Sequence, residues 1–158
     1  SLMSKSGLIW DTNKEKAIEK GNLIHKLMSQ IKSKIDVEIT MNQFLEDGVI
    51  NTSQYKELNS IILTIINHPE LKEYYNLGIV SYNEREIIQK RGGNLIPDRI
   101  VLNKDNKAVI IDYKSGSPKN YHENQLNSYE KALNNMGYST LKKLLVYIES
   151  GIVIVKSF

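Results

Sequence analysis

The stretch that decides the fold reads PDRIVLNKDNKAVIIDYK and spans Pro97 to Lys114. Two apolar, strand-like segments flank a polar turn of residues 103–107, and this pattern predicts a β-hairpin. If the hairpin is symmetric about Asp105, Asp98 lies directly opposite Asp112. Cross-strand partners lie about 4.5–5.5 Å apart on one face of a sheet. The hairpin is therefore expected to hold two like charges side by side.

A lysine follows the second acid at the spacing that suits phosphodiester hydrolysis. Side chains alternate along a strand, so Lys114 is expected on the same face as Asp112. Mg²⁺ and Mn²⁺ favour carboxylate oxygens together with water and phosphate, and such an ion lowers the pKa of a bound water. Lys114 can orient that water or hold a phosphate oxygen. The competing interpretation is a surface hairpin with an incidental acid pair and a solvated lysine.

Composition sets the broad class. With 158 residues, of which 41% are hydrophobic and 25% charged, the sequence (1–158) is expected to form one globular domain. A net charge of +3 permits nucleic-acid binding without requiring it. The absence of cysteine excludes disulfides, zinc ribbons and iron–sulfur clusters. Neither a membrane span nor a signal peptide is visible, so we expect a cytoplasmic protein without a membrane partner. Ser1-Leu2 before Met3 resembles a cloning remnant, which suggests a fragment of a longer protein.

The periodicity of apolar residues changes halfway along the chain. The first half has helical spacing and the second half has strand patterns separated by turn residues. This order predicts an α/β fold, with a helical N-terminal half and a mixed central sheet flanked by helices. The expected helices are 13–33, 36–47 with Asp36 as N-cap and Gly48 as the stop, 53–67, a short turn at 71–75, and 121–136; the expected strands are 79–89, 95–102, 108–114, 141–148 and 152–156.

The hairpin resembles the signature of the PD-(D/E)xK nucleases, because Pro97-Asp98 is followed by Asp112-Tyr113-Lys114. The extended run through Ser115-Gly116 is similar to the RecB-like branch of that family. Two further patterns agree with this branch: G-x-x-x-H from Gly21 to His25, and Q-x-x-x-Y from Gln125 to Tyr129. PD-(D/E)xK alone is a weak pattern, whereas the four motifs in this order are specific. The resemblance implies a restriction-endonuclease-like fold and a nuclease that uses Mg²⁺ or Mn²⁺.

The resemblance also implies a role for each motif residue. It makes Asp98, Asp112 and Lys114 catalytic, and it gives His25, Asp98, Asp112 and Tyr113 as metal ligands. Gln125, Tyr129 and Arg99 are expected to contact DNA. By spacing alone, a single helix histidine such as His25 is more often structural, and the alternative for the Gln125 and Tyr129 pair is a tyrosine packed on the sheet beside a solvated glutamine.

A third acidic residue is expected in the strand before the hairpin, where the family often has a glutamate. Both Glu84 and Glu86 fit, and we favour Glu86 because Ile87 and Ile88 tie it to the core. Lys119 is a further candidate phosphate contact, and His122 is interpreted as a residue of a helix start rather than a ligand.

The function expected from this resemblance is a metal-dependent DNA nuclease of repair or recombination, either an exonuclease or a single-strand-preferring nuclease, that works beside a helicase. The expected partner is DNA, as a single strand or a duplex end. The chain has no G-x-x-x-x-G-K-[ST] phosphate loop, so an ATPase motor would lie elsewhere in the same chain or complex. The main alternative is a nuclease-like DNA-binding or assembly module without catalysis. A stand-alone endonuclease of restriction type is a weaker alternative.

Overall fold

The computed structural model describes residues 5–158, and their side chains from residue 13 onward. Three helices come first: α1 (Lys5–Gln30), α2 (Asp36–Glu46) and α3 (Thr52–Ile66), followed by the short 3₁₀ helix η1 (Lys72–Tyr75). The second half contains β1 (Val80–Asn83), β2 (Arg99–Leu102), β3 (Lys107–Ser115), α4 (Asn120–Asn135), β4 (Ser139–Glu149) and β5 (Ile152–Ser157). This order confirms the predicted α/β class with a helical N-terminal half.

Local signals explain the helix boundaries. At the start of α3, the Asn51 side chain accepts from the Gln54 N–H and the Gln54 side chain accepts from the Asn51 N–H, a reciprocal capping box. Gly48 follows α2 with a φ of +72°, a conformation that glycine adopts without strain. Asp36 is the first residue of α2 rather than its N-cap, because its carboxylate accepts the N–H groups of Lys32 and Ser33 in the preceding turn.

The strands form one five-stranded sheet in the order β1-β2-β3-β4-β5. Neighbouring strands are antiparallel except for β3 and β4, which are parallel. The sheet is therefore mixed, as predicted. In the hairpin, Arg99 pairs with Ile111 and Leu102 with Ala108, which is the register expected for symmetry about Asp105.

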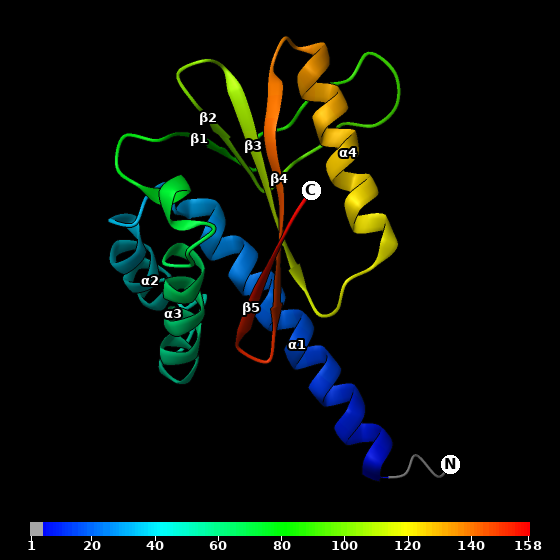
Figure 1. Ribbon diagram of the computed structural model, residues 1–158. Coiled ribbons are helices and arrows are strands. Elements are labelled where there is room, and N and C mark those ends of the chain that lie inside the picture. Colours follow the sequence, from blue (N-terminus) through cyan, green and yellow to red (C-terminus); the bar gives the residue numbers. More distant parts are fainter. Residues whose placement is uncertain (1–4) are drawn as a thin grey trace.

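Helices cover both faces of the sheet (Figure 1). Helices α1 to α3 pack on one face around Val109, Ile111 and Val146, and α4 packs on the other face around Ile110 and Leu145. Because strand side chains alternate, Asp112 and Lys114 share the α4 face with Ile110. The fold thus places the predicted acid and lysine beneath the N-terminal half of α4.

Two strand predictions are too long. The strand expected over residues 79–89 ends at Asn83, because Glu84 adopts a φ of +48° and turns the backbone away from β2. The strand expected from Leu95 begins only at Arg99. Between them, residues 84–98 form a loop whose single bridge pairs Ile87 with Leu95. Among the described residues, no helix has the length and apolarity needed to cross a membrane.

Candidate active site

The carboxylates of Asp98 and Asp112 lie together at the start of β2, next to the pair that Arg99 forms with Ile111 on β3. Asp112 Oδ1 accepts the backbone N–H of Asp98 at 2.9 Å, and Asp98 Oδ2 accepts the backbone N–H of Tyr113 at 2.8 Å. The Asp112 side chain is only 3% exposed, whereas that of Asp98 is 17% exposed. The backbone of each partner strand therefore fixes one oxygen of each carboxylate and leaves the other for further contacts.

Lys114 lies beside Asp112, as the alternation of β3 predicts. Its Nζ is 3.1 Å from Asp112 Oδ2 and also donates to Gln125 Oε1 on α4. Burial raises the pKa of the Asp112 carboxyl to about 7, the nearby charge of Asp98 adds to the rise, and Lys114 opposes it. This carboxylate would therefore take up a proton near neutral pH unless a further cation were present.

His25 reaches the other side of the acid pair from α1. Its Nε2 lies 2.8 Å from the Tyr113 carbonyl oxygen and 3.3 Å from Asp98 Oδ2, and its Nδ1 lies 3.0 Å from the Gly21 carbonyl oxygen. Carbonyl oxygens only accept hydrogen bonds, so both ring nitrogens must carry a proton to satisfy these contacts. Consistently, the hydrogen bond to Asp98 raises the pKa of His25 to about 9, against the effect of burial.

Gly21 allows α1 to approach the end of β3. A Cβ atom at this position would lie 2.2 Å from Ser115 Oγ and 3.1 Å from Ser115 Cβ. Because Gly21 has no side chain, Ser115 can lie close to α1. Ser115 directly follows Lys114, one of the candidate catalytic residues. One turn further along α1, the same helix face brings His25 to the Tyr113 carbonyl.

Helix α4 supplies two predicted residues with different surroundings. Gln125 is partly exposed and contacts Lys114 directly. Tyr129, four residues later, is buried, and its hydroxyl lies 3.5 Å from the Ile96 carbonyl oxygen in the loop that leads to Asp98. Gln125 thus contacts the cluster directly, whereas Tyr129 contacts the loop that leads to it.

The structure contradicts the prediction that Arg99 contacts DNA. Its side chain is fully buried on the face of the sheet covered by α1 to α3, opposite to Asp98. The guanidinium donates to the carbonyl oxygens of Ile31, Lys32 and Tyr74 and stacks on the Tyr75 ring. Arg99 is therefore a structural residue with no access to a phosphate.

Two other predicted residues lie differently from their expected roles. The Tyr113 side chain is buried between the sheet and helices α1 to α3, with its hydroxyl against that of Tyr75, so only its carbonyl oxygen faces the site. Glu86 is exposed in the loop, and its carboxylate accepts from the Asn94 amide at 2.6 Å. Glu84 is exposed too. Neither glutamate carboxylate contacts Asp98 or Asp112, although the Glu84 backbone N–H donates to the Asp98 carbonyl oxygen.

His122 takes the structural position expected for it. It is buried in the first turn of α4, where its Nδ1 accepts the Lys119 N–H at 3.2 Å and lies 2.9 Å from the Tyr147 hydroxyl. Asn83 is a supporting residue that the sequence did not reveal. Its amide donates to Ser29 and Ile31 carbonyls and accepts from Arg99, so it ties β1 to the end of α1. An asparagine at a strand end is usually a turn signal, and no sequence pattern points to this role.

The donor atoms at the acid pair fit a hard divalent cation. Asp98 and Asp112 offer carboxylate oxygens and Tyr113 offers a carbonyl oxygen, which are the ligands that Mg²⁺ and Mn²⁺ prefer. His25 Nε2 points at the same oxygens and would have to lose its proton to bind a metal. Within residues 13–158, no three His, Cys, Asp or Glu side chains already form a metal-binding cluster. The carboxylate pair therefore is the part of the site suited to hold such an ion.

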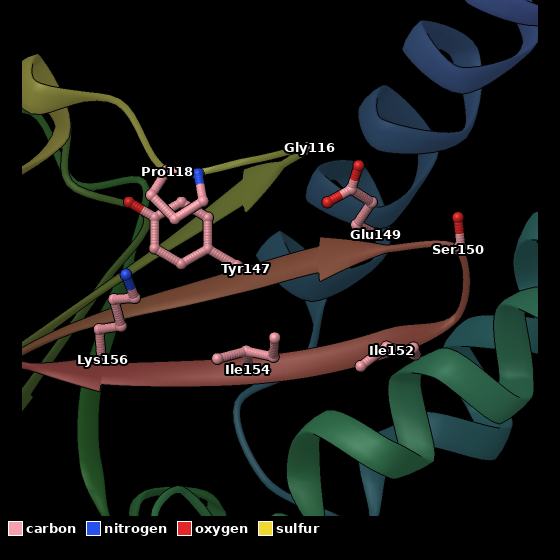
Figure 2. A pocket seen from close by; sticks show the side chains of 8 residues that line it. All are labelled: Gly116, Pro118, Tyr147, Glu149, Ser150, Ile152, Ile154 and Lys156. Atoms are coloured by element: carbon pink, nitrogen blue, oxygen red, sulfur yellow. The ribbon is translucent and has the colours of Figure 1, made fainter.

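Two hollows open near the end of β3. One of about 460 Å³ lies against α1 and is lined by Lys16, Lys20, Gly21 and Ser115 among others. The second, of about 370 Å³, lies over β4 and β5 beside Gly116 and Pro118 (Figure 2). Figure 2 shows Ile152 and Ile154 along β5 and Lys156 near the Tyr147 ring. Asp98, Asp112 and Lys114 line neither of these two hollows.

Comparison with known proteins identifies the family. The sequence profile of the PD-(D/E)XK nuclease superfamily matches residues 4–154, and the chain therefore belongs to this superfamily. Its members act on nucleic acids as phosphodiesterases and typically use divalent metals. The matched region includes all four motifs named above, in order, and it agrees with the fold.

More distant similarities exist among solved structures. The crystal structure of the protein SSO0001 is 18% identical, with a TM-score of 0.38 over 98% of this chain and 79% of that one. An N-terminal domain of a reptarenavirus L protein is 15% identical, with a TM-score of 0.32 over 82% of this chain and 70% of that one. No curated protein matches the sequence.

Proposed function

We propose that the chain is a Mg²⁺- or Mn²⁺-dependent deoxyribonuclease. The observation that carries this proposal is the convergence of four sequence motifs on one place. His25 from α1, Asp98 before β2, Asp112 and Lys114 on β3, and Gln125 on α4 are linked through direct contacts. This arrangement brings two carboxylates together in a partly buried place, which does not favour the stability of the fold. Stability therefore does not explain why residues so far apart in sequence meet here, and such clusters are typical of functional sites.

Each residue then has a defined task in hydrolysis. Asp98 and Asp112 would hold the ion, which lowers the pKa of a water and offsets negative charge on the phosphate. Lys114 is placed to donate to a phosphate oxygen or to orient the attacking water, and Gln125 holds the Lys114 ammonium in position. His25 donates to Asp98 and to the Tyr113 carbonyl, so it keeps the first carboxylate oriented.

The finer assignment follows the RecB-like resemblance of the motifs. We propose an exonuclease of DNA repair or recombination that acts in the cytoplasm. In this proposal residues 1–158 are one nuclease domain of a longer helicase–nuclease, and a helicase or other ATPase module works beside it. The order and spacing of the G-x-x-x-H and Q-x-x-x-Y helices support this branch, since both helices flank the acid pair from opposite faces of the sheet.

The decisive experiment compares Asp112→Asn with wild type. End-labelled single- and double-stranded DNA is incubated with Mn²⁺, Mg²⁺ or EDTA. We expect metal-dependent cleavage that falls at least about 1,000-fold in the variant, because one carboxylate of the proposed metal site is lost. Asp105→Asn, in the exposed turn of the same hairpin, is the matched control and should cleave like wild type.

A second measurement separates a domain that needs its partner from an inactive module. Mn²⁺ should raise the thermal midpoint of wild type by mass action, and it should not do so in Asp112→Asn. Cleavage by Asp112→Asn at the wild-type rate would refute the assignment of the site. Neither cleavage nor metal-dependent stabilisation of wild type would instead favour a nuclease-like module without chemistry.

A further inference from the structure

The loop between β1 and β2, residues 84–98, has an unusual tip. Ile88 is 80% exposed, the highest value among the exposed large hydrophobic side chains of the described residues, and Ile96 across the loop is 51% exposed. Lys90 and Arg91 come after Ile88 and the half-buried Gln89 and are also exposed, and Gly92 turns the backbone with a φ of +88°. Neither cation pairs with an acidic side chain in the part of the chain that the structure describes.

The base of this loop is attached to the active site. The Glu84 N–H donates to the Asp98 carbonyl oxygen at 3.0 Å, and Ile87 and Leu95 exchange backbone hydrogen bonds of 2.7 and 3.1 Å. Ile87 is 5% exposed and packs in the core beneath α4. In Figure 1 the loop runs alongside α4, the helix that supplies Gln125. The loop is therefore anchored through residues 87 and 95, while residues 88–94 project beyond the anchor.

Two other charges of the loop have contacts, and a third lies at its base. The Glu86 carboxylate accepts from Asn94, and the Arg85 guanidinium lies 5.2 Å from the centre of the Tyr82 ring on β1. The exposed Glu84 lies at the start of the loop, away from its tip. What remains available at the tip is one aliphatic side chain and two adjacent cations. Nucleic-acid-binding proteins use this combination: cations neutralise phosphates, and aliphatic side chains press against or between base pairs.

We propose that residues 88–91 form a contact for the end of a DNA duplex whose strand enters the site at Asp98. Lys90 and Arg91 contact phosphates of the duplex, and Ile88 abuts its terminal base pair. A duplex end is favoured over a bare single strand because single-strand sites stack bases on aromatic rings, and the tip carries none. This inference rests on the proposed function, since it names the DNA structure that the same site would take.

Binding measured without cleavage tests the inference. In the Asp112→Asn background, fluorescence anisotropy records the affinity for a labelled duplex with a single-stranded tail and for the single strand alone. Lys90→Gln/Arg91→Gln should weaken duplex binding about tenfold and make the slope of log affinity against log salt shallower by about 2, as expected for two phosphate contacts. Ile88→Ala should weaken binding of the tailed duplex more than that of the single strand.

Matched controls lie on the opposite layer. Ile39→Ala removes a 70% exposed isoleucine of α2, and Lys56→Gln/Lys72→Gln removes two exposed lysines; both should leave the affinities unchanged. The inference is overturned if the loop variants bind like these controls, if Ile88→Ala affects both ligands equally, or if no DNA binds. Loop-dependent binding by a wild-type protein that neither cleaves DNA nor is stabilised by Mn²⁺ would refute the proposed nuclease and leave the loop contact standing.

Discussion

At the scale of single residues, His25 shows how the site controls its own charge. Its two ring nitrogens face the carbonyl oxygens of Gly21 and Tyr113, and Asp98 lies beside the second nitrogen. These oxygens favour the doubly protonated ring, which is why the pKa of His25 rises to about 9. In the absence of metal, the imidazolium therefore compensates part of the negative charge of the acid pair.

This charge predicts a pH dependence of stability. The pKa of His25 is higher in the folded protein than the usual histidine value of 6.5, so the stabilisation is complete below that value and is lost as pH rises through about 9. In EDTA, the free energy of unfolding in urea should fall between pH 6.5 and 9. His25→Gln should remove most of this fall, whereas His68→Gln, far along the chain in the turn after α3, should keep it. An unchanged fall in His25→Gln would contradict the assignment.

The sequence predicted that Asp98 and Asp112 lie together, but it did not predict the burial of Arg99. The contact of the two aspartates was predictable because a hairpin is local: its turn residues fix the register, and the register fixes which side chains face each other. Alternation also places Arg99 on the opposite face, but an arginine in a strand is normally exposed. The carbonyl oxygens that accept from the buried guanidinium belong to residues 31, 32 and 74, and no local sequence pattern indicates such distant partners.

At the scale of secondary-structure elements, the packing of α1 against β3 sets the position of His25. The contact depends on Gly21, where an added Cβ atom would meet Ser115. Ser115 lies at the exposed end of β3, one residue after Lys114. A small change at the contact between Gly21 and Ser115 is therefore expected to displace both His25 on α1 and Lys114 on β3.

We predict that Gly21→Ala lowers DNA cleavage about tenfold or more, because α1 must move away from the Tyr113 carbonyl oxygen. The free energy of unfolding should fall by no more than about 2 kcal/mol, since the roughly 1 kcal/mol gain in helix propensity offsets part of the cost of overpacking, about 1–3 kcal/mol. Removing the obstructing side chain with Ser115→Gly should restore much of the activity in the double variant. Cleavage rates and urea unfolding check both parts, and an equally inactive double variant would show that the contact is not the cause.

Element boundaries were predicted best where the signal was periodic. The helices appear within a few residues of their expected ends, apart from the N-terminal part of α1, because apolar stripes and capping residues mark them. The β1 strand was overestimated because residues 85–89 have strand-like composition, while the backbone turns at Glu84. A left-handed glutamate is uncommon and has no sequence signal. The same error placed Glu86 on a strand face that does not exist, so the third acidic residue could not be assigned.

At the scale of the whole molecule, Arg99 joins parts that are far apart in sequence. Its two terminal nitrogens reach the end of α1, the turn after it, η1 and Asn83 on β1. All of these lie on the face of the sheet that α1 to α3 cover, opposite to the face that carries Asp98. Arg99 thus fixes the helical layer to the hairpin that carries the carboxylates.

Replacing Arg99 should therefore destabilise the whole fold. Arg99→Met removes the guanidinium donors of the Lys32 and Tyr74 carbonyl oxygens and one of the two side-chain donors of the Ile31 carbonyl oxygen, and we expect the free energy of unfolding in urea to fall by about 3 kcal/mol. Arg85→Met, an exposed arginine of the neighbouring loop, should change it by less than about 1 kcal/mol. A stable Arg99→Met protein that fails to bind DNA would instead restore the role predicted from sequence.

The hairpin that pairs Asp98 with Asp112 also has a consequence for the order in which the chain folds. These residues are joined by a short turn, so the loop that brings them together closes at little entropic cost. Lys114, beside Asp112, arrives with the hairpin. His25, beside Asp98, arrives later, since its contact with Tyr113 spans 88 residues and long-range contacts form slowly. A refolding chain therefore brings its two carboxylates together while only one of the two cations is in place, and the formation of this hairpin is slowed by a repulsion that the finished site offsets more fully.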